Sequence, residues 1–208
     1  MQEKILKKLG ISALNEMQKT AYSRISEYEN DILLLSPTGT GKTLAYLLPL
    51  IEDIDTDDVE VQALVITPSR ELALQSHDVA KNIGFGIRSM ACYGGRPAMD
   101  EHRRMNEINP HIIFATPGRL LDHLEKGNIV TSSIGVVVID EFDKCLELGF
   151  RDEMHLLTSS FQNVKYQMLL SATDSPEIPQ FIDIDATCTR LDYLESEEQI
   201  PDRINVKL

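Results

Sequence analysis

The sequence lacks the features that mark secreted, membrane and zinc-binding proteins. Its three cysteines, Cys92, Cys145 and Cys188, form no C-x-x-C pair, and its five histidines show no metal-ligand spacing. The first ten residues contain no apolar core of signal-peptide length, and no apolar run approaches the roughly 20 residues of a membrane span. We therefore expect a reduced, cytoplasmic protein that makes no contact with a membrane.

Positive charge is scarce, with 20 Lys and Arg against 33 Asp and Glu and a formal net charge of −13. Eleven of the acids fall in two segments that contain no Lys or Arg, residues 52–60 and 192–202. Without those 11 charges the net charge of −13 becomes −2 for the rest of the chain. The main body can therefore present a locally basic face, and a nucleic-acid partner is not excluded.

Apolar runs of strand length alternate with segments of helical periodicity along the chain, without internal repeats or low-complexity linkers. The runs are continuous in Val, Ile and Leu, which favours strands covered on both faces. Gly84 and Gly127 stand where helix C-caps are expected. The pattern predicts one α/β domain with a mostly parallel, doubly wound sheet. The expected strands are 31–36, 61–67, 87–93, 111–116, 135–140 and 166–173, and the expected helices are 42–51, 69–83, 97–108, 117–126 and 143–160.

The most specific motif follows the first apolar run, at the end of a predicted strand where such sheets bind ligands. The segment SPTGTGKT matches the phosphate-binding pattern G-x-x-x-x-G-K-[ST], except that Ser36 replaces the first glycine. Lys42 is expected to reach the β- and γ-phosphates, and Thr43 to bind Mg²⁺. A glycine-rich turn that only caps a helix is the alternative, which the preceding strand and following helix disfavour. The expected nucleotide-binding residues are Ser36, Pro37, Thr38, Gly39, Thr40, Gly41, Lys42 and Thr43.

Three carboxylates crowd the end of a later strand, in the segment VVVIDEFDK at residues 136–144. Asp140 is expected to hold Mg²⁺, through water, because this ion keeps much of its hydration shell. Glu141 is expected to orient or activate the attacking water. A solvated acidic turn would explain these acids alone, but it fits poorly beside a phosphate-binding loop.

Two other classes of phosphate-loop protein are disfavoured. The GTPase patterns D-x-x-G and N-K-x-D do not occur, and no arginine-rich lid of a small-molecule kinase is visible. The 98 residues from Lys42 to Asp140 are many for a compact nucleoside kinase. This spacing favours a RecA-like motor core.

The segments SPTGTGKT, TPSRELALQ, YGG, TPGRL, DEFD and SAT occur in the order and at about the separations found in the DEAD-box ATP-dependent RNA helicases. The chain resembles this family over nearly its whole length. The resemblance implies a RecA-like P-loop NTPase fold, the use of ATP with Mg²⁺, and sequence-independent binding of an RNA backbone.

Three of these segments supply the expected RNA contacts. Arg70 lies in the first turn of a predicted helix, where a cation opposes the helix dipole and suits an external phosphate. A surface ion pair of Arg70 with Glu71 or Asp78 is the alternative. The glycines at the other two strand ends leave N–H groups open to phosphate, and Thr116 is the expected N-cap of a helix. The expected RNA-binding residues are Pro68, Arg70, Gly94, Gly95, Arg96, Thr116, Pro117, Gly118 and Arg119.

The SAT segment is expected to couple the nucleotide state to RNA binding, as the resemblance implies. The hydroxyl groups of Ser171 and Thr173 could hydrogen-bond Asp143, the last acid of DEFD. Phe142 departs from the family, which has alanine at this place, but the three flanking acids match.

The segment GISALNEMQ, residues 10–18, resembles the adenine-reading motif of the family. Its Gln18 carries an amide that could pair with the N6 and N7 edge of adenine. Leu14 stands where proline is usual, and the family's upstream aromatic, which stacks on adenine, lies beyond this sequence. These departures predict adenine specificity with reduced affinity.

An H-R-x-G-R motif, which carries arginine fingers in the second RecA-like domain of the family, does not occur. We expect 1–208 to be a single ATP-binding domain, the N-terminal half of a longer helicase that hydrolyses ATP to remodel or unwind RNA. Residues 1–30 would hold the adenine-recognition segment and a lead-in helix, and 190–208 would lead to the second domain. The alternative is a nucleotide-gated RNA-binding scaffold module that never unwinds RNA.

Overall fold

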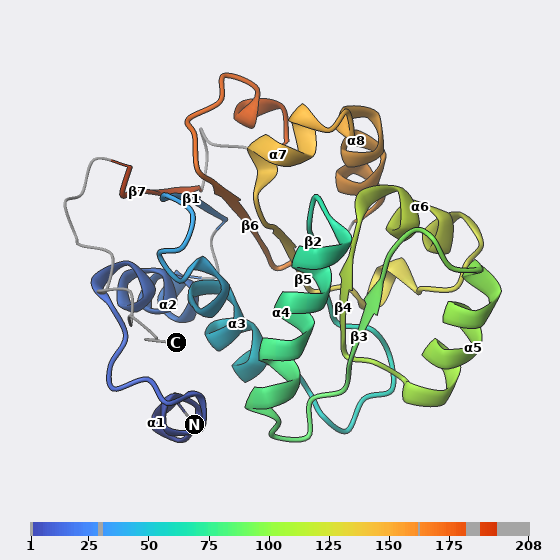
Figure 1. Cartoon of the computed structure of the whole chain (residues 1–208), viewed down its shortest axis with the longest axis horizontal. Coiled ribbons are helices and arrows are strands. Elements are labelled where there is room, and N and C mark those ends of the chain that lie inside the picture. The colour runs from blue at the N-terminus through green and yellow to red at the C-terminus, as the bar shows by residue number, and fades with distance from the viewer. Residues whose placement is uncertain (1, 29–30, 162, 182–187, 195–208) are drawn as a thin grey trace, which may run out of the picture.

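A computed structural model of the chain describes residues 2–28, 31–161, 163–181 and 188–194. Its centre is a twisted sheet of seven strands in the order β3-β4-β2-β5-β6-β1-β7 (Figure 1). All neighbouring strands pair in parallel, which confirms the expected α/β architecture. The strands are β1 (Ile32–Leu35), β2 (Ala63–Ile66), β3 (Ser89–Cys92), β4 (Ile112–Ala115), β5 (Val136–Ile139), β6 (Tyr166–Ser171) and β7 (Thr189–Asp192).

Helices cover both faces of the sheet, and each face has its own apolar core. Strand side chains alternate between the cores with the period of two that a pleated strand imposes, so that Leu34 joins one core and Leu33 and Leu35 join the other. The first core is covered by α1 (Gln2–Leu9), α2 (Glu16–Tyr28), α3 (Lys42–Asp53) and α4 (Arg70–Ile83). The second is covered by α5 (Ala98–Ile108), α6 (Pro117–Glu125), α7 (Phe142–Glu147) and α8 (Arg151–Ser160).

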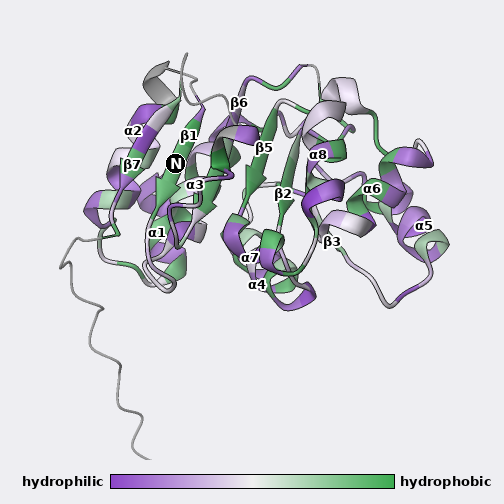
Figure 2. Ribbon diagram, turned by 90° about the horizontal axis from the view of Figure 1, so that it is seen from above, coloured by the Kyte–Doolittle hydropathy of each residue, from purple (hydrophilic) through white to green (hydrophobic). Residues whose placement is uncertain are grey.

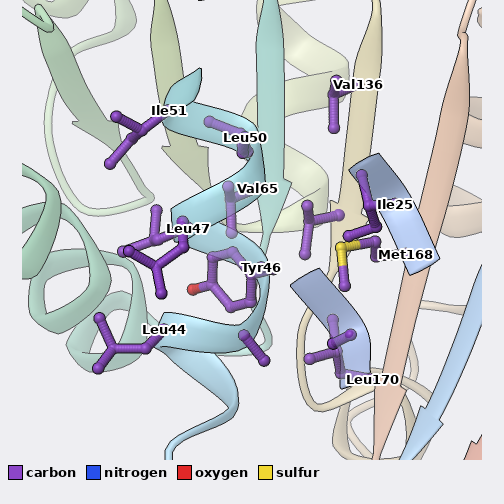
Figure 3. Packing of buried hydrophobic residues seen from close by; sticks show 14 of the residues in the cluster. Ile25, Leu44, Tyr46, Leu47, Leu50, Ile51, Val65, Val136, Met168 and Leu170 are labelled. Carbon is purple, nitrogen blue, oxygen red and sulfur yellow. The ribbon is translucent and has the colours of Figure 1, made fainter. Parts of the chain in front are cut away.

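The apolar runs of the sequence form the interior, as Figure 2 shows by the hydrophobic colour of the strands. Helix α3 begins at Lys42, and fully buried residues of its first two turns, including Tyr46 and Leu47, fix it in the interior (Figure 3). These side chains lie in one cluster with Val65 of β2 and Met168 of β6. Because each buried side chain of this size contributes about 1.5–3 kcal/mol, α3 is held firmly at its N-terminal end.

Two of the expected helical segments are each divided into two helices. The segment 143–160 forms two helices rather than one, and Gly149 lies in the left-handed region at φ 87° in the break. The N-terminal segment holds two helices, α1 and α2, rather than one. Gly84 caps α4 as expected, whereas the C-cap of α6 is Lys126, directly before Gly127.

The seventh strand, β7, was not expected, because TRLD is short and polar. It pairs in parallel with β1, and its residues 190–192 fall in the segment that was expected to lead to another domain. Arg190 of this strand binds Asp174 and Asp192, at 2.8 Å from each carboxylate. Residues 1, 29–30 and 195–208 of the two terminal segments lie outside the described residues.

Within the described ranges, none of the helices is both long and apolar enough to cross a lipid bilayer. Cys92 and Cys145 are buried as free thiols. Burial raises the pKa of the Cys145 thiol well above its usual range, so this side chain stays protonated in the second core.

Phe142, which stands where the resembled family has alanine, is part of the second core. Its ring is fully buried and meets the edge of Phe181 with a centroid distance of 5.0 Å. Phe181 in turn stacks on His155 at 4.3 Å. The larger side chain therefore fills space between α7 and the segment after β6.

We expect Phe142→Ala to lower the free energy of unfolding by about 3–5 kcal/mol, because it removes a buried ring and leaves a cavity. Urea unfolding monitored by circular dichroism measures this loss. Leu148→Ala is the control, since Leu148 is 61% exposed, and it should change stability by less than about 0.5 kcal/mol. A loss of under about 1 kcal/mol for Phe142→Ala would show that the core closes without the ring.

Candidate functional site

The strand order sorts the predicted motifs into two groups at the carboxyl edge of the sheet. One group follows β1, β6 and β5, which are neighbours, and comprises the 36–43 loop, the 171–173 segment and Asp140 with Glu141. The other group follows β2, β4 and β3, which are also neighbours, and comprises the expected RNA contacts. Because β5 pairs with β2, the acids lie at the border between the groups.

Lys42 lies inside the phosphate-binding loop. Its side chain is 7% exposed, and Nζ donates to the carbonyls of Ser36 at 2.7 Å and Pro37 at 3.0 Å. Burial lowers the pKa of Lys42, while the charges of Asp140 and Glu141 oppose that shift. The ammonium is thus bound by neutral acceptors, which a phosphate anion would outcompete.

Ser36, in place of the usual glycine, closes the loop on itself. The Thr40 hydroxyl donates to the Pro37 carbonyl at 2.9 Å, so it accepts from the Ser36 hydroxyl at 2.7 Å. The backbone N–H of Ser36 donates to the Ser171 carbonyl at 3.0 Å. Pro37, Thr38 and Gly39 form the exposed tip of the loop. The Ser36 side chain therefore stabilises the loop, and its backbone N–H joins the loop to β6.

Asn15 and Gln18, at the start of α2, form hydrogen bonds to the same loop. The Asn15 side chain accepts from Gln18 N at 2.8 Å, and the Gln18 side chain accepts from Asn15 N at 3.0 Å, which together form a capping box. Asn15 Nδ2 then donates to the Thr40 carbonyl at 3.0 Å, and Gln18 Nε2 donates to the Gly41 carbonyl at 3.1 Å. A Cβ at Gly41, whose φ is 89°, would lie 2.4 Å from Gln18 Nε2, so only glycine fits there.

Both polar atoms of the Gln18 amide are thus engaged within the protein, and the side chain is 6% exposed. The reading of adenine by Gln18 stays a prediction. Asn15 was missed by reasoning from sequence, although the pattern N-x-x-Q at 15–18 signals a capping box. Its second bond, to the Thr40 carbonyl 25 residues away, leaves no local pattern.

Asp140 and Glu141 are buried side by side, at 5% and 6% exposure. Burial is the main reason that the pKa of Asp140 rises to about 6, and the nearby Lys42 charge opposes the rise. Asp140 Oδ1 is buried without a hydrogen-bond partner in the described part of the chain. A lone buried carboxylate oxygen is a ligand of the kind that Mg²⁺ prefers, so Asp140, with the Thr43 hydroxyl, fits such an ion.

Glu141 adopts a strained backbone conformation, with φ 51° in the left-handed region. Such conformations cost about 1–3 kcal/mol in residues other than glycine and are found mainly at functional sites. Its carboxylate forms an ion pair with Lys144 at 3.0 Å, and this contact raises the pKa of Lys144. The strained backbone therefore marks Glu141 as a candidate functional residue.

The expected link between the SAT segment and Asp143 is formed by one of its two hydroxyl groups. Thr173 Oγ1 donates to Asp143 Oδ2 at 3.1 Å. Ser171 does not bond Asp143; its hydroxyl donates to the Thr173 carbonyl at 2.7 Å and accepts from Thr173 N at 3.2 Å. Ser171 therefore shapes the turn that presents Thr173 and is one contact removed from the acid.

In the second group, two exposed arginines contact the ring of Tyr93. The guanidinium carbons of Arg70 and Arg96 lie 5.3 Å and 5.2 Å from the ring centroid. Among the described residues, neither Glu71 nor Asp78 forms an ion pair with Arg70. Two positive groups, which follow the strands β2 and β3 on either side of β4, are therefore available to an external anion.

Arg119 differs from the expectation of a free phosphate contact. Its side chain is 11% exposed, with Nη1 at 3.4 Å from Glu101 Oε2 and Nη2 donating to the Arg96 carbonyl at 2.6 Å. The physical reason is that a buried carboxylate attracts the guanidinium more strongly than solvent does. Thr116 is the N-cap of α6, as expected, but without a side-chain cap bond. Gly94, Gly95 and Gly118 are exposed, and Pro68 and Pro117 are buried.

Residues 15–181 match the family model DEAD/DEAH box helicase. The chain belongs to this family. It is 39% identical over 145 residues to the DEAD-box ATP-dependent RNA helicase CshA of Bacillus subtilis, covering 69% of this chain and 29% of that protein. It is 32% identical over 177 residues to the ATP-dependent RNA helicase CshA of Limosilactobacillus reuteri, covering 84% and 35%. The chain spans about a third of the length of these DEAD-box relatives.

Solved structures of DEAD-box proteins share the fold. A hypothetical ATP-dependent RNA helicase from Sulfolobus tokodaii superposes with a TM-score of 0.81 at 32% identity, over 93% of this chain and 57% of that one. The DEAD-box helicase Mss116 bound to ssRNA and UDP-BeF gives a TM-score of 0.78 at 29% identity, over 91% and 42%. The domain is therefore RecA-like, as the sequence resemblance implied.

We expect Asn15→Ala to lower the free energy of unfolding by about 1 kcal/mol, because it removes the N-cap of α2. It should also weaken nucleotide binding about fivefold, because the Thr40 carbonyl loses a hydrogen bond worth about 1 kcal/mol that holds the loop. Asn15→Ser separates the two effects, since serine caps a helix but cannot donate to Thr40. The serine variant should regain stability but not affinity, and titration with a fluorescent ATP analogue measures the affinity. Full recovery of affinity would contradict a role for the hydrogen bond from Asn15 to the Thr40 carbonyl.

Asp140 should make stability depend on pH. Its pKa is raised from 3.8 to about 6, so the folded state holds this proton more tightly than the unfolded state. The resulting stabilisation is complete below pH 3.8 and is lost as the pH rises through about 6. Without nucleotide or Mg²⁺, the wild type should lose about 1 kcal/mol more than Asp140→Asn between about pH 5 and 7. Urea unfolding of both proteins measures the difference, and parallel pH profiles would contradict the buried, protonatable carboxyl.

Proposed function

We propose that the chain is the ATP-binding half of an ATP-dependent RNA helicase, which hydrolyses ATP to remodel or unwind RNA together with a second RecA-like domain. The observation that carries the proposal is the adjacency of two strand-end groups: a phosphate-binding loop with buried acids, and a neighbouring edge with exposed arginines and glycines. The names of the relatives, ATP-dependent RNA helicases, support it.

ATP binding begins with the loop between β1 and α3. Lys42 exchanges the carbonyls of Ser36 and Pro37 for the β- and γ-phosphate oxygens, which bind an ammonium more strongly. The N–H groups at the start of α3 add the attraction of a helix N-terminus. Asp140 and Thr43 would hold Mg²⁺, which neutralises charge on the phosphates when bound. Adenine is read by the Gln18 amide once it leaves Asn15 N and the Gly41 carbonyl.

Hydrolysis is assigned to Glu141. Glu141 follows Asp140 directly, and its backbone is held in the left-handed region. Asp140 would hold the cation, and Glu141 would face the attacking water. Glu141 orients that water and accepts its proton. Lys144 forms an ion pair with the Glu141 carboxylate at 3.0 Å.

RNA binding is assigned to the second group of strand ends. Arg70 and Arg96 are exposed there, and the N–H groups of Gly94, Gly95 and Gly118 lie at the same edge. Contacts of this kind address phosphates and carry little sequence information. The bond of Thr173 to Asp143 and that of Ser36 to Ser171 link the strand ends of the nucleotide group to one another, and β5 of that group pairs with β2 of the RNA edge. The similarity to a DEAD-box helicase bound to ssRNA supports the assignment.

A second domain is part of the proposal because the sequence contains no arginine-finger motif. An arginine finger raises phosphoryl-transfer rates by about 10³–10⁵, so a chain that lacks one should turn over slowly. The chain also spans about a third of its relatives' length. ATP and RNA binding are therefore the activities to test on this chain, and multiple-turnover unwinding belongs to the joined domains.

We expect Lys42→Ala to weaken ATP binding at least tenfold, because it removes a charge-assisted bond worth about 1.5–3 kcal/mol. Glu141→Gln should keep the affinity of the wild type yet slow single-turnover hydrolysis about 100-fold, the contribution of a general base. Equilibrium titration with ATP and a rapid-quench assay with excess single-stranded RNA measure the two effects.

The matched control is Lys81→Ala, which removes one positive charge from an exposed place on α4 and should bind ATP like the wild type. Unchanged ATP binding in Lys42→Ala would remove the assignment of the phosphate-binding loop. Loss of ATP binding in Glu141→Gln would show that the two acids do not divide their roles as proposed.

A further inference from the structure

Glu101 of α5 is a buried carboxylate in the half of the sheet that faces RNA. Its side chain is 6% exposed, and Oε1 accepts from the backbone N–H of Tyr93 at 3.2 Å. Oε2 lies 3.1 Å from His123 Nε2 and 3.4 Å from Arg119 Nη1. A buried charge is costly unless it is paired and hydrogen-bonded. Here the Tyr93 N–H, just after β3, and His123 of α6 hydrogen-bond the carboxylate, and Arg119 of α6 pairs with its charge.

Arg119 extends this pairing to the surface loop. Its Nη2 donates to the carbonyl of Arg96 at 2.6 Å, while Nη1 faces Glu101. The planar fork of a guanidinium can bridge two acceptors in fixed geometry, which a lysine ammonium on a flexible stem cannot reproduce. One side chain therefore joins the first turn of α6, helix α5 and the 93–97 loop.

His123 completes the cluster from the last turn of α6. It is fully buried, and Asn128 Nδ2 donates to its Nδ1 at 3.0 Å. The imidazole then carries its proton on Nε2 and donates to Glu101 Oε2. A neutral donor satisfies the carboxylate without cancelling its charge, so Glu101 remains the counter-ion of Arg119.

We propose that Glu101 and Arg119 form a buried strut that positions two RNA-contacting loops, and that Arg119 is a positioning residue rather than a phosphate ligand. The strut holds the 93–97 loop against the start of α6, so the exposed N–H groups of Gly94, Gly95 and Gly118 share one edge. It also fixes the backbone of Tyr93, whose ring is contacted by the guanidinium groups of Arg70 and Arg96. The inference deepens the proposed RNA binding and rests on it.

A metal site is the other chemistry that this cluster suggests. Ligand atoms of Cys92, Glu101 and His123 lie within 4.8 Å of one another, and all three residues are buried. The guanidinium of Arg119 already neutralises the carboxylate, and a second cation there would repel it. Burial raises the pKa of the Cys92 thiol, and the Glu101 charge adds to the rise, so the thiolate that a metal needs is disfavoured. The hydrogen-bonded strut explains the geometry better.

The test compares variants of the 208-residue chain in binding a 20-nucleotide single-stranded oligouridylate between about 50 and 300 mM KCl. With Arg70 and Arg96 as the phosphate ligands, the wild type should show a log–log salt slope of about −1.4, roughly −0.7 for each. Arg119→Lys keeps the charge but breaks the bridge, so affinity should fall about tenfold with the slope unchanged. Arg96→Ala should make the slope shallower by about 0.7.

Three controls separate positioning from general damage. Arg104→Ala removes an exposed charge of α5 and should bind RNA like the wild type. Glu101→Gln, which keeps the size of the side chain, should lose as much affinity as Arg119→Lys, and the double variant should lose no more than either. All of these variants should bind ATP with the affinity of the wild type. If Arg119→Lys does not fold, the RNA affinity of Glu101→Gln tests the strut instead.

The inference is overturned if Arg119→Lys binds RNA like the wild type while Arg119→Ala makes the slope shallower by about 0.7, the behaviour of a direct phosphate ligand. It is also overturned by stoichiometric zinc uptake that His123→Asn abolishes, which would establish a metal site. A wild type that binds ATP but no RNA at 50 mM salt would refute the RNA part of the proposed function, and the strut's role with it. That outcome is seen in the wild-type arm alone and is thus distinguishable from a failure of the strut.

Discussion

The pairing of β6 with β1 on one side and β5 on the other is the constraint on which the candidate site depends. Leu35 is in register with Ser171, and Ile139 with Leu169, so the phosphate-binding loop and Asp140 leave the sheet one strand apart on either side of β6. Parallel strands lie about 4.8 Å apart, which sets roughly 10 Å between the two strand ends. A slip of one residue would exchange the two cores and turn the site away, so the buried apolar faces also fix the site's geometry.

The site concentrates charge that the rest of the interior excludes. Lys42, Asp140, Glu141 and Asp143 are all less than 9% exposed, and three of the four are acids. Their mutual repulsion is relieved in two ways: the pKa of Asp140 rises to about 6, and Lys144 at the surface pairs with Glu141. The remaining excess of negative charge favours the entry of a cation. The site is therefore expected to be completed by its ligand.

The sequence was most informative where a residue's role is set by its immediate neighbours. Apolar runs predicted the strands because burial on both faces needs Val, Ile and Leu, and the glycines with Lys42 predicted the loop because its backbone turn needs them. The contacts of Arg119 were not predictable, because its partner Glu101 lies on another helix and the pairing exists only after α5 and α6 dock. Asn15 was missed for the same reason, since its bond to the Thr40 carbonyl spans 25 residues.

The polar edge strand β7 bears on how the chain avoids unwanted association. An edge strand presents unpaired backbone groups that can template pairing with another chain, and a charged edge discourages it. In the sequence TRLD only Leu191 is buried, while Arg190, held by Asp174 and Asp192, is exposed. A second molecule that docked along this strand would have to desolvate those charges. The residues that made β7 hard to recognise as a strand thereby protect the sheet from growing past its seventh member.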